Sequence, residues 1–272
     1  TSRLELKKAF TNILYKKYQK NLQKPKPDNL LINFLLTRKF IFPMSTGGTS
    51  GSPLIVYRNR EGLCTDALLF LRGWKMMDYK LGDKVLIFYP EYYDYNLSWI
   101  NRFYFLSGIK LFFFNSLSKE TVEQLVREIN SFKPDFITTF PSYLNDAAII
   151  IKKEKLILEH IPKGIEVSGE ILFDYQRKSC KEIFKTEIYD SYGSLETGMI
   201  AHECKFHNGM HIYEDIVYPE SLNNNLIFTR TNLSEMPIIR YNIGDLGKVI
   251  YEKCKCGISG KKLTEVEGRI ED

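Results

Sequence analysis

A repeating order of short apolar and amphipathic segments runs from residue 84 to residue 190 and constrains the fold more than any other feature. The apolar segments are rich in β-branched and aromatic residues, which favour strands. Continuous apolar strands separated by helices are typical of a parallel sheet covered on both faces. The predicted strands are Lys84–Tyr89, Ile109–Phe114, Asp135–Thr139, Gly164–Ser168 and Glu187–Asp190.

Helices are predicted in the intervals between these strands. Val122, Leu125, Val126 and Ile129 mark one helix face by their spacing, and the segments Tyr143–Ile151 and Asp174–Phe184 show similar periodicity. Crossovers between parallel strands are right-handed, and ligands gather at the carboxyl ends of the strands. We therefore expect any binding site to lie in the loops that follow the strands.

The pattern changes after Tyr192, where short strands follow one another without helices between them. We therefore predict an α/β fold, with parallel sheets flanked by helices and a smaller antiparallel β region towards the C-terminus. The domains are expected to be a helical segment (1–40), an α/β body (41–200) and a β-rich subdomain (201–272). The predicted late strands are His211–Tyr218, Asn225–Arg230, Ile238–Tyr241 and Leu246–Tyr251.

Composition excludes several classes of protein. Hydrophobic residues make up 44% of the 272, which is enough to bury a substantial core. No apolar run approaches the roughly 20 residues of a membrane helix. The net charge of +5 is mild, and the lysines near the start fit a solvated helix face better than a nucleic-acid surface. The five unevenly spaced cysteines argue against a disulfide framework, so we expect a cytoplasmic protein without nucleic-acid or membrane partners.

The first chemical motif is a glycine-, serine- and threonine-rich stretch, Ser45 to Pro53, between two predicted extended segments. Its glycines let the backbone approach a ligand closely, and its hydroxyls and N–H groups can donate to phosphate oxygens. It is not a Walker loop, because the Gly-Lys-Ser/Thr spacing is missing. A flexible glycine turn is the alternative interpretation.

Three further motifs follow in order. Asp190 to Glu196 reads Asp-Ser-Tyr-Gly-Ser-Leu-Glu directly after a predicted strand, where its aromatic ring can stack a base and its carboxylate can hold Mg²⁺. Arg240 to Asp245 ends in a Gly-Asp turn suited to ribose hydroxyls, and Gly268 to Asp272 closes the chain. Taken singly, each could be an ordinary turn or a solvated surface segment.

Together, the order and spacing of the four motifs resemble the signature series of the adenylate-forming superfamily of acyl-CoA synthetases, luciferases and adenylation domains. Three smaller features resemble its phenylacetate–CoA ligase-like branch: Lys133-Pro134-Asp135 with Pro141-Ser142-Tyr143, Ser168-Gly169-Glu170, and the Met-Pro-x-x-Arg-Tyr segment that starts at Met236. The glycine loop departs from the family pattern, because Gly47 replaces a hydroxyl residue and Ser52 replaces a lysine.

The resemblance implies specific roles. Asp245 and Arg269 would hold the ribose, and Gly169, Glu170 and Tyr192 would frame the adenine. Glu196 would bind Mg²⁺ and act catalytically together with Thr49. The remaining cofactor-binding residues would be Thr46, Gly47, Gly48, Ser50 and Gly51 around the phosphates, and Asp190, Ser191, Gly193 and Ser194 in the second motif.

The reaction implied is attack of a carboxylate on the α-phosphate of ATP, which yields an acyl-adenylate and pyrophosphate. Transfer of the acyl group to a thiol then releases AMP. CoA is the expected acceptor; a carrier-protein thiol or an amine stays open. The aromatic run from Tyr89 to Tyr95 and the segment Phe140–Tyr143 favour a small planar or aromatic acid. The sequence leaves open whether the chain forms a homodimer.

Family members carry a lid domain after a hinge, which here falls at Glu271, and that lid holds the catalytic lysine. We therefore expect the chain as given to bind nucleotide but to adenylate poorly. A lid-less, non-catalytic nucleotide-binding or scaffold protein is the alternative.

Cysteines and histidines of the last third suit a tetrahedral Zn²⁺ site. Cys204 precedes two histidines, and Cys254-Lys255-Cys256-Gly257 forms a tight Cys-x-Cys turn. Some phenylacetate–CoA ligase-like proteins look similar here and carry structural zinc. The expected ligands are Cys204, His211, Cys254 and Cys256, with His207 as the alternative imidazole; scattered free cysteines are the competing interpretation.

Overall fold

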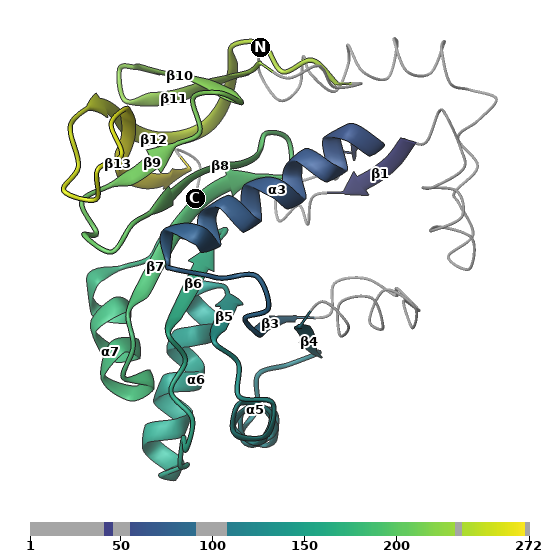
Figure 1. Cartoon of the computed structure of the whole chain (residues 1–272), viewed down its shortest axis with the longest axis vertical. Helices are drawn as coiled ribbons and strands as arrows, with labels where there is room; N and C mark the ends of the chain where they lie inside the picture. The colour runs from purple at the N-terminus through teal and green to yellow at the C-terminus, as the bar shows by residue number, and fades with distance from the viewer. Residues whose placement is uncertain (1–40, 46–54, 91–107, 232–235, 270–272) are drawn as a thin grey trace.

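The computed structural model describes residues 41–45, 55–90, 108–231 and 236–269 (Figure 1). The predicted N-terminal helical segment, the glycine-rich loop from Thr46 onward and the predicted hinge residue Glu271 lie outside the described residues. Two strands flank that loop, β1 (Ile41–Ser45) and β2 (Ile55–Asn59). They pair antiparallel, with Ser45 opposite Ile55, so the two extended segments predicted around the loop are confirmed.

An 11-stranded mixed sheet forms the body of the described chain, in the order β10-β11-β12-β13-β9-β8-β7-β6-β5-β3-β4. Its parallel half is the predicted one, and the predicted strands agree closely with those observed. Neighbouring strands pair in parallel register throughout this half. The strands are β3 (Val85–Pro90), β4 (Ile109–Phe114), β5 (Phe136–Thr139), β6 (Gly164–Ser168) and β7 (Ile188–Ser194).

Helices α5 (Lys119–Phe132), α6 (Pro141–Glu154) and α7 (Asp174–Phe184) cover one face of the parallel half (Figure 1). Their apolar stripes share one buried cluster with alternate strand residues such as Leu86 and Ile137. Local chemistry sets the helix ends. The Ser118 side chain accepts from the Thr121 N–H at the start of α5, and a proline occupies the first turn of α6.

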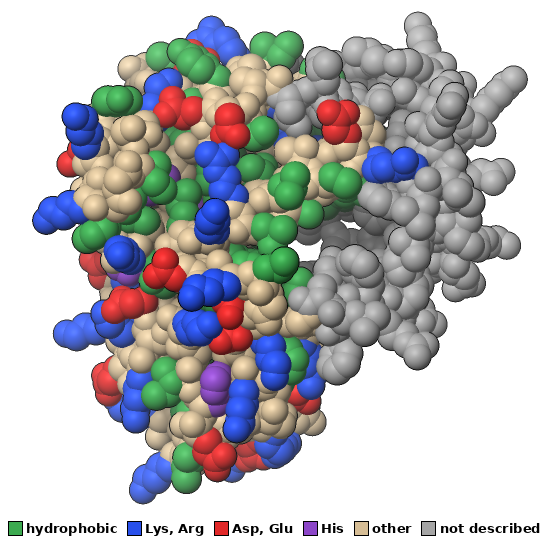
Figure 2. Space-filling view, viewed as in Figure 1, with side chains coloured by type: hydrophobic (Ala, Val, Ile, Leu, Met, Phe, Trp, Pro, Cys, Tyr) green, Lys and Arg blue, Asp and Glu red, His purple; other side chains and the backbone are tan. Residues whose placement is uncertain are grey.

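Helix α3 (Arg60–Met76) lies on the opposite face and was not predicted. Its Trp74 packs with the alternate strand residues Val85, Phe136 and Tyr189. The helix is apolar on its outer side as well, where Leu68 is 63% exposed, and Figure 2 shows apolar side chains gathered over it. Because apolar residues surround α3, no single stripe distinguishes it in the sequence.

The antiparallel half joins the parallel half through β7, so the two predicted regions form one continuous sheet. Helices are absent among its described strands, as predicted. The predicted domain boundary near residue 200 falls inside strand β8 of this sheet. The division into domains stays a prediction. The strands are β8 (Gly198–Glu203), β9 (Met210–Ile212), β10 (Val217–Leu222), β11 (Asn225–Arg230), β12 (Tyr241–Tyr251) and β13 (Lys261–Arg269).

Two of the late strand predictions were wrong. The segment His211–Tyr218 is not one strand, because a turn in which Ile216 and Val217 both donate to the Tyr213 carbonyl separates β9 from β10. Ile238–Tyr241 is not a strand either: β12 begins only at Tyr241, after Arg240 adopts a φ of 43° that breaks the extended run. Strands β8 and β13 had not been predicted.

No helix among the described residues is long and apolar enough to span a membrane. On the face in Figure 2, basic and acidic side chains are interspersed over the described part of the surface.

Candidate functional site

The second and third predicted motifs meet in the structure, although about fifty residues separate them. Tyr192, on β7, donates its hydroxyl to Asp245 Oδ2 on β12 at 2.6 Å. The ring of Tyr192 packs against Phe228 with centroids 6.0 Å apart. A tyrosine ring and a carboxylate therefore lie side by side where the parallel half of the sheet passes into the antiparallel half.

Glu196 lies just beyond β7 and is 3% exposed. Its Oε1 accepts a hydrogen bond from the hydroxyl of Tyr241, the first residue of β12, at 3.2 Å. The turn before β8 is closed by Ser194, whose Oγ accepts from the Thr197 N–H at 3.1 Å. The carboxylate of the second motif is thus buried and held by the third motif.

The pairing of strands β12 and β13 places the fourth motif next to the third. β12 and β13 pair antiparallel, and Asp245 is the Cα partner of Arg269. The sheet therefore aligns the two residues predicted to hold a ribose. The first motif, with Thr46, Gly47, Gly48, Thr49, Ser50 and Gly51, lies outside the described residues.

Ser191 belongs to a buried polar network that sequence reasoning missed. Its Oγ donates to Glu166 Oε1 at 2.9 Å, and Glu166 also accepts from Trp74 Nε1 at 2.7 Å and Thr138 Oγ1 at 3.0 Å. His202 Nε2 lies 3.3 Å from the same carboxylate. The available signal was a single glutamate inside an apolar strand, which must find partners when it is buried.

Burial alone would raise the pKa of Glu166, but His202 and the neutral donors outweigh it and hold that pKa below its usual value. For His202, burial would lower the pKa, and the facing Glu166 raises it overall. Each group therefore favours the charged form of the other, and their contact links β6 to β8 behind the second motif.

Asp190 lies on the opposite face of β7 from Ser191, because neighbouring strand residues alternate. Its Cα partner is Val167, which belongs to the core under α7. Burial first, and the negative charge of Glu203 second, raise the pKa of Asp190 from 3.8 to about 8. The structure therefore does not bring the Asp190 carboxyl together with Ser191, although we predicted that both bind the same ligand.

The strand end after β6 carries Gly169 and Glu170. Gly169 has a φ of 80°, and a Cβ there would lie 2.6 Å from the Phe140 ring, so only glycine lets that ring approach. The Glu170 Oε2 accepts from the Ser142 N–H at 3.0 Å, at the start of α6.

Aromatic rings gather at the carboxyl ends of β3, β4 and β5. Tyr89 and Phe140 have centroids 4.7 Å apart, Phe140 and Tyr143 5.8 Å, and Tyr143 meets Phe114 edge-on at 5.1 Å. Tyr89, Phe140 and Tyr143 are all partly exposed. These rings offer planar apolar surface at the ligand-binding edge of the sheet.

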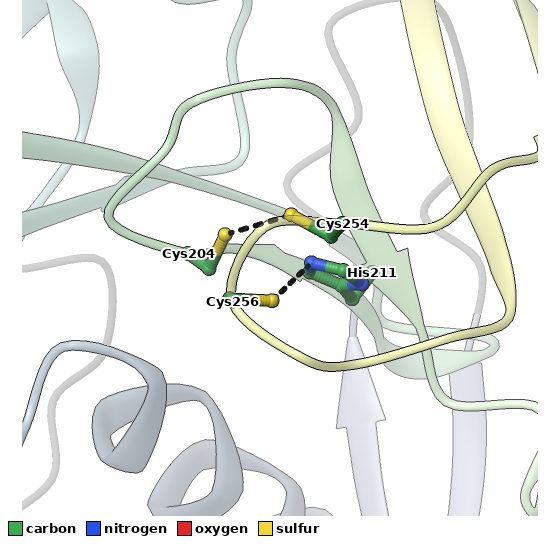
Figure 3. A group of neighbouring side chains, drawn as sticks. All are labelled: Cys204, His211, Cys254 and Cys256. Carbon is green, nitrogen blue, oxygen red and sulfur yellow. Dashed lines mark hydrogen bonds between the residues drawn. The ribbon is translucent and has the colours of Figure 1, made fainter.

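Four side chains of the antiparallel half form a cluster that can hold a metal ion (Figure 3). One ligand atom each of Cys204, His211, Cys254 and Cys256 lies within 4.8 Å of all the others. The sulfurs of Cys204 and Cys254 are 3.6 Å apart, and Cys256 Sγ is 3.4 Å from His211 Nε2. Zn–S bonds of about 2.3 Å at tetrahedral angles place two sulfurs about 3.8 Å apart, so the donor set and its spacing fit zinc.

The cluster closes three chain segments around one point: the end of β8, strand β9, and the turn between β12 and β13 (Figure 3). Lys262, 0% exposed and paired with His211 across the strands, adds positive charge beside it. Burial would raise the pKa of Cys254, but hydrogen bonds within the cluster and the charge of Lys262 hold it below its usual value. A lowered pKa favours the thiolate at Cys254, whereas burial raises the pKa of Cys204 to about 12, so a metal ion that binds there would have to displace the Cys204 proton.

His207 lies elsewhere. Its Nδ1 is 2.9 Å from Glu203 Oε2 and 3.1 Å from Arg177 Nη1, and its Nε2 is 3.4 Å from Glu187 Oε2. The geometry therefore brings His211, and not His207, together with the three cysteines.

A family model described as AMP-binding enzyme matches residues 25–220 of this chain. A phenylacetate-coenzyme A ligase of Thermus thermophilus is 30% identical over 171 residues, which cover 55% of this chain and 37% of that protein. A phenylacetate-coenzyme A ligase of Pseudomonas putida is 24% identical over 244 residues, or 84% of this chain and 54% of that protein. The chain thus spans about half the length of these relatives, or less.

Among solved structures, an open conformation of 2-hydroxyisobutyryl-CoA ligase in complex with 2-HIB-AMP and CoA superposes with a TM-score of 0.73 at 19% identity, covering 100% of this chain and 60% of that one. ATP-bound MatB from Rhodopseudomonas palustris superposes with a TM-score of 0.56 at 14% identity, covering 84% of this chain and 47% of that one. At these identities the similarity establishes the fold, and it agrees with the predicted α/β class.

Proposed function

Because this chain belongs to the AMP-binding enzyme family, in its phenylacetate–CoA ligase-like branch, we propose that it is the nucleotide-binding body of an enzyme that activates a carboxylic acid with ATP. In the first half-reaction the carboxylate would displace pyrophosphate from the α-phosphate of ATP and form an acyl-adenylate. The CoA thiol would then accept the acyl group with release of AMP. The Tyr192–Asp245 hydrogen bond of 2.6 Å carries the proposal, because it joins the ring that we expect to border the base to the carboxylate that we expect to bind the ribose.

In this proposal, different residues of the site contact the adenine, the ribose and the phosphates of ATP. The Tyr192 ring and the strand end at Gly169 and Glu170 would border the adenine, while Asp245 and Arg269 would receive the ribose hydroxyls. The loop from Thr46 to Gly51, with Thr49, would donate to the phosphates. Asp190, Ser191, Gly193 and Ser194 would shape the strand end between them.

Glu196 would hold Mg²⁺, whose charge, when bound, neutralises the phosphates. The Tyr241 hydroxyl fixes the Glu196 carboxylate before a ligand arrives, which lowers the cost of ordering it. No nucleophile of the protein is needed for adenylation, because the substrate carboxylate attacks the α-phosphate itself. Orientation and charge stabilisation are what these residues supply.

Calorimetry with ATP and Mg²⁺ tests the nucleotide site. We expect the wild-type chain to bind ATP more tightly with Mg²⁺ than without it, and Glu196→Gln to lose that difference. Glu182→Gln, an exposed carboxylate change on α7, is the control and should bind as the wild type does. Absence of ATP binding in the wild-type chain would reject the proposal and favour a scaffold.

For the acid we propose an aromatic carboxylate, supported by the partly exposed rings of Tyr89, Phe140 and Tyr143 and by the similarity to phenylacetate-coenzyme A ligases. Saturation-transfer NMR with ATP present should detect aryl acids and not short alkyl acids. Phe140→Ala should reduce the aryl signal, whereas equal signals for both classes would reject an aryl pocket. Adding CoA, a carrier-protein thiol or an amine in turn identifies the acceptor.

We further propose that Cys204, His211, Cys254 and Cys256 hold a structural Zn²⁺. The spacing of their ligand atoms supports this, and such a site would link β8 and β9 to the β12–β13 turn. The zinc content of purified protein, measured by mass spectrometry, should be one per chain and should fall in His211→Ala. His207→Ala is the matched control and should keep the metal; the opposite result would reassign the imidazole ligand.

A further inference from the structure

Arg58 is a fully buried arginine close to the proposed site, and none of the sequence motifs includes it. It lies on β2, five residues after the glycine-rich motif ends at Pro53, and it is 1% exposed. Its Nη2 donates to two successive backbone carbonyls, Leu195 at 2.7 Å and Glu196 at 3.0 Å. The guanidinium therefore binds the backbone of Glu196, whose carboxylate is proposed to hold Mg²⁺.

Asp66 on α3 orients this guanidinium. Its Oδ2 accepts from Arg58 Nε at 2.9 Å, and its Oδ1 accepts from Arg230 Nη1 at 3.2 Å. Gly198, with a φ of 71°, makes room for this contact, since a Cβ there would lie 2.6 Å from Asp66 Oδ1. Arg58, Asp66 and Arg230, here called the arginine brace, thus join β2, α3 and β11 to the turn that carries Glu196.

Burying the charges of the arginine brace costs free energy. Two guanidinium groups share one carboxylate, and Arg58 Nη1 is buried without a hydrogen-bond partner. Removing a charge from water costs several kcal/mol, and a well-packed apolar residue would often be as stable. What an apolar residue cannot supply is a rigid planar donor that fixes two consecutive carbonyls. The geometry therefore favours a role in orientation over a role in stability alone.

We propose that Arg58 is a positioning residue for Glu196. It fixes the Leu195–Glu196 backbone from the β2 side while Tyr241 fixes the carboxylate from the β12 side, so the Mg²⁺-binding oxygens are oriented before the nucleotide binds. This inference rests on the proposed binding of ATP and Mg²⁺. It predicts that Arg58 changes the contribution of Mg²⁺ to ATP binding and leaves the binding of ATP alone nearly unchanged.

The test measures ATP affinity by calorimetry with and without Mg²⁺ in Arg58→Lys and Arg58→Met. Both should remain folded by circular dichroism, and the Mg²⁺-dependent gain in affinity should fall by about tenfold, a coupling typical of groups in direct contact. Arg127→Met, an exposed arginine change on α5, is the control and should keep the full gain. A merely structural role would lower the melting temperature and leave the Mg²⁺ gain intact.

A double-mutant cycle makes the test specific. If Arg58 acts through Glu196, the losses of the Mg²⁺ gain in Arg58→Lys and in Glu196→Asp, which keeps a shorter carboxylate, should not add in the double variant. Additive losses, or an unchanged Mg²⁺ gain in Arg58→Lys, would overturn the inference while ATP binding by the wild type still supports the proposed function. Should both Arg58 variants unfold, Asp66→Asn decides: a reduced gain supports the brace, and an unchanged gain rejects it.

Discussion

In the half of the sheet formed by β3 to β7, apolar strand residues such as Leu86 and Ile137 are buried against helices close to them in sequence. In the half formed by β8 to β13, strands pack on one another, and the buried residues include Glu203, Arg230 and Lys262. Glu166 is the one acidic or basic side chain among the buried residues of the parallel strands that the structure describes. Both halves bury an apolar cluster, which in the antiparallel half includes Leu226, Phe228 and Leu263. The difference is that the antiparallel half also buries paired charges and the cysteine–histidine cluster.

Apolar burial tolerates small displacements, whereas a buried charge or a metal ligand requires its partner within hydrogen-bond or bonding distance. The residues proposed to bind nucleotide lie at the junction of the two halves. We therefore expect changes in the apolar core to affect global stability, and changes of the buried charges and metal ligands of the antiparallel half to act locally on its turns and ligands.

The largest effect is expected for Ile129→Ala. Ile129 on α5 is 0% exposed in the parallel core, and removing a buried aliphatic side chain costs about 2–5 kcal/mol. Urea denaturation should show this loss in the free energy of unfolding. Ile149→Ala on α6 is the control, because Ile149 is 52% exposed and should change stability little. Equal effects of the two changes would contradict the assignment of this core.

The same contrast explains how far the sequence predicted the structure. The helix predicted at Asp174–Phe184 is α7 and the strand at Asn225–Arg230 is β11, with identical bounds, because in each the local pattern and the burial agree. The turn that starts at Tyr213 broke a predicted strand, since a backbone hydrogen-bond pattern decides it and Asp215, without a neighbouring glycine or proline, is a weak turn signal. Helix α3 was missed because its apolar residues lie on all sides.

The site was predictable to the same limited degree. The tight Cys-x-Cys turn identified the zinc candidates, and the structure brings all four of them together. Contacts between distant polar residues could not be predicted, because nothing in the local pattern of Arg58 or Asp66 indicates Leu195 or Arg230 as a partner. The ligands of the proposed nucleotide site stay predictions until nucleotide binding is measured.

Removing the metal should affect the antiparallel half of the sheet and leave the parallel half unchanged. If the free zinc concentration is about 100 times the Kd, removing the zinc lowers the free energy of unfolding by about 2.7 kcal/mol. Hydrogen exchange after chelation should accelerate in β9 and in the turn between β12 and β13, and stay unchanged in β5 and β6. Cys256→Ser should mimic chelation, whereas Cys64→Ser, an exposed change on α3, should not. Acceleration throughout the sheet would argue against a local clamp.

A smaller effect is expected from Lys262→Met. Burial lowers the pKa of His211 and the Lys262 ammonium lowers it further, while Lys262 assists the hydrogen bonds of the cluster in lowering the pKa of Cys254. Its charge would also compensate the net negative charge of three thiolates around one Zn²⁺. Removing this charge should weaken zinc affinity by about tenfold, as for other groups next to metal ligands, in a competition assay with a chromophoric chelator. Lys261→Met, next to it but partly exposed, should leave the affinity unchanged. Equal affinities in both variants would show that the charge has no such role.

A pH-dependent effect is expected for Asp190, at the boundary between the two halves. Its pKa is raised to about 8 by burial and by Glu203, so the folded state holds a proton between pH 4 and pH 8 that the unfolded chain releases. The proton stabilises the folded state fully below the ordinary Asp pKa, and this stabilisation is lost as pH rises through the folded-state pKa. Asp190→Asn removes the titration, so its stability relative to the wild type should increase from pH 4 to pH 8 and then level off.

We expect the gain to accumulate steadily between pH 4 and pH 8, because each pH unit in that range removes a further part of the stabilisation, and to appear as a rising Tm of Asp190→Asn relative to the wild type. Thermal unfolding of both proteins at several pH values measures it, and Asp215→Asn, at a 60% exposed side chain, should show no such trend. If Asp190→Asn instead destabilises the chain more at pH 8 than at pH 5, the charged carboxylate is required there. The boundary strand would then depend on a paired charge, as the antiparallel half does, and not on burial of a neutral group.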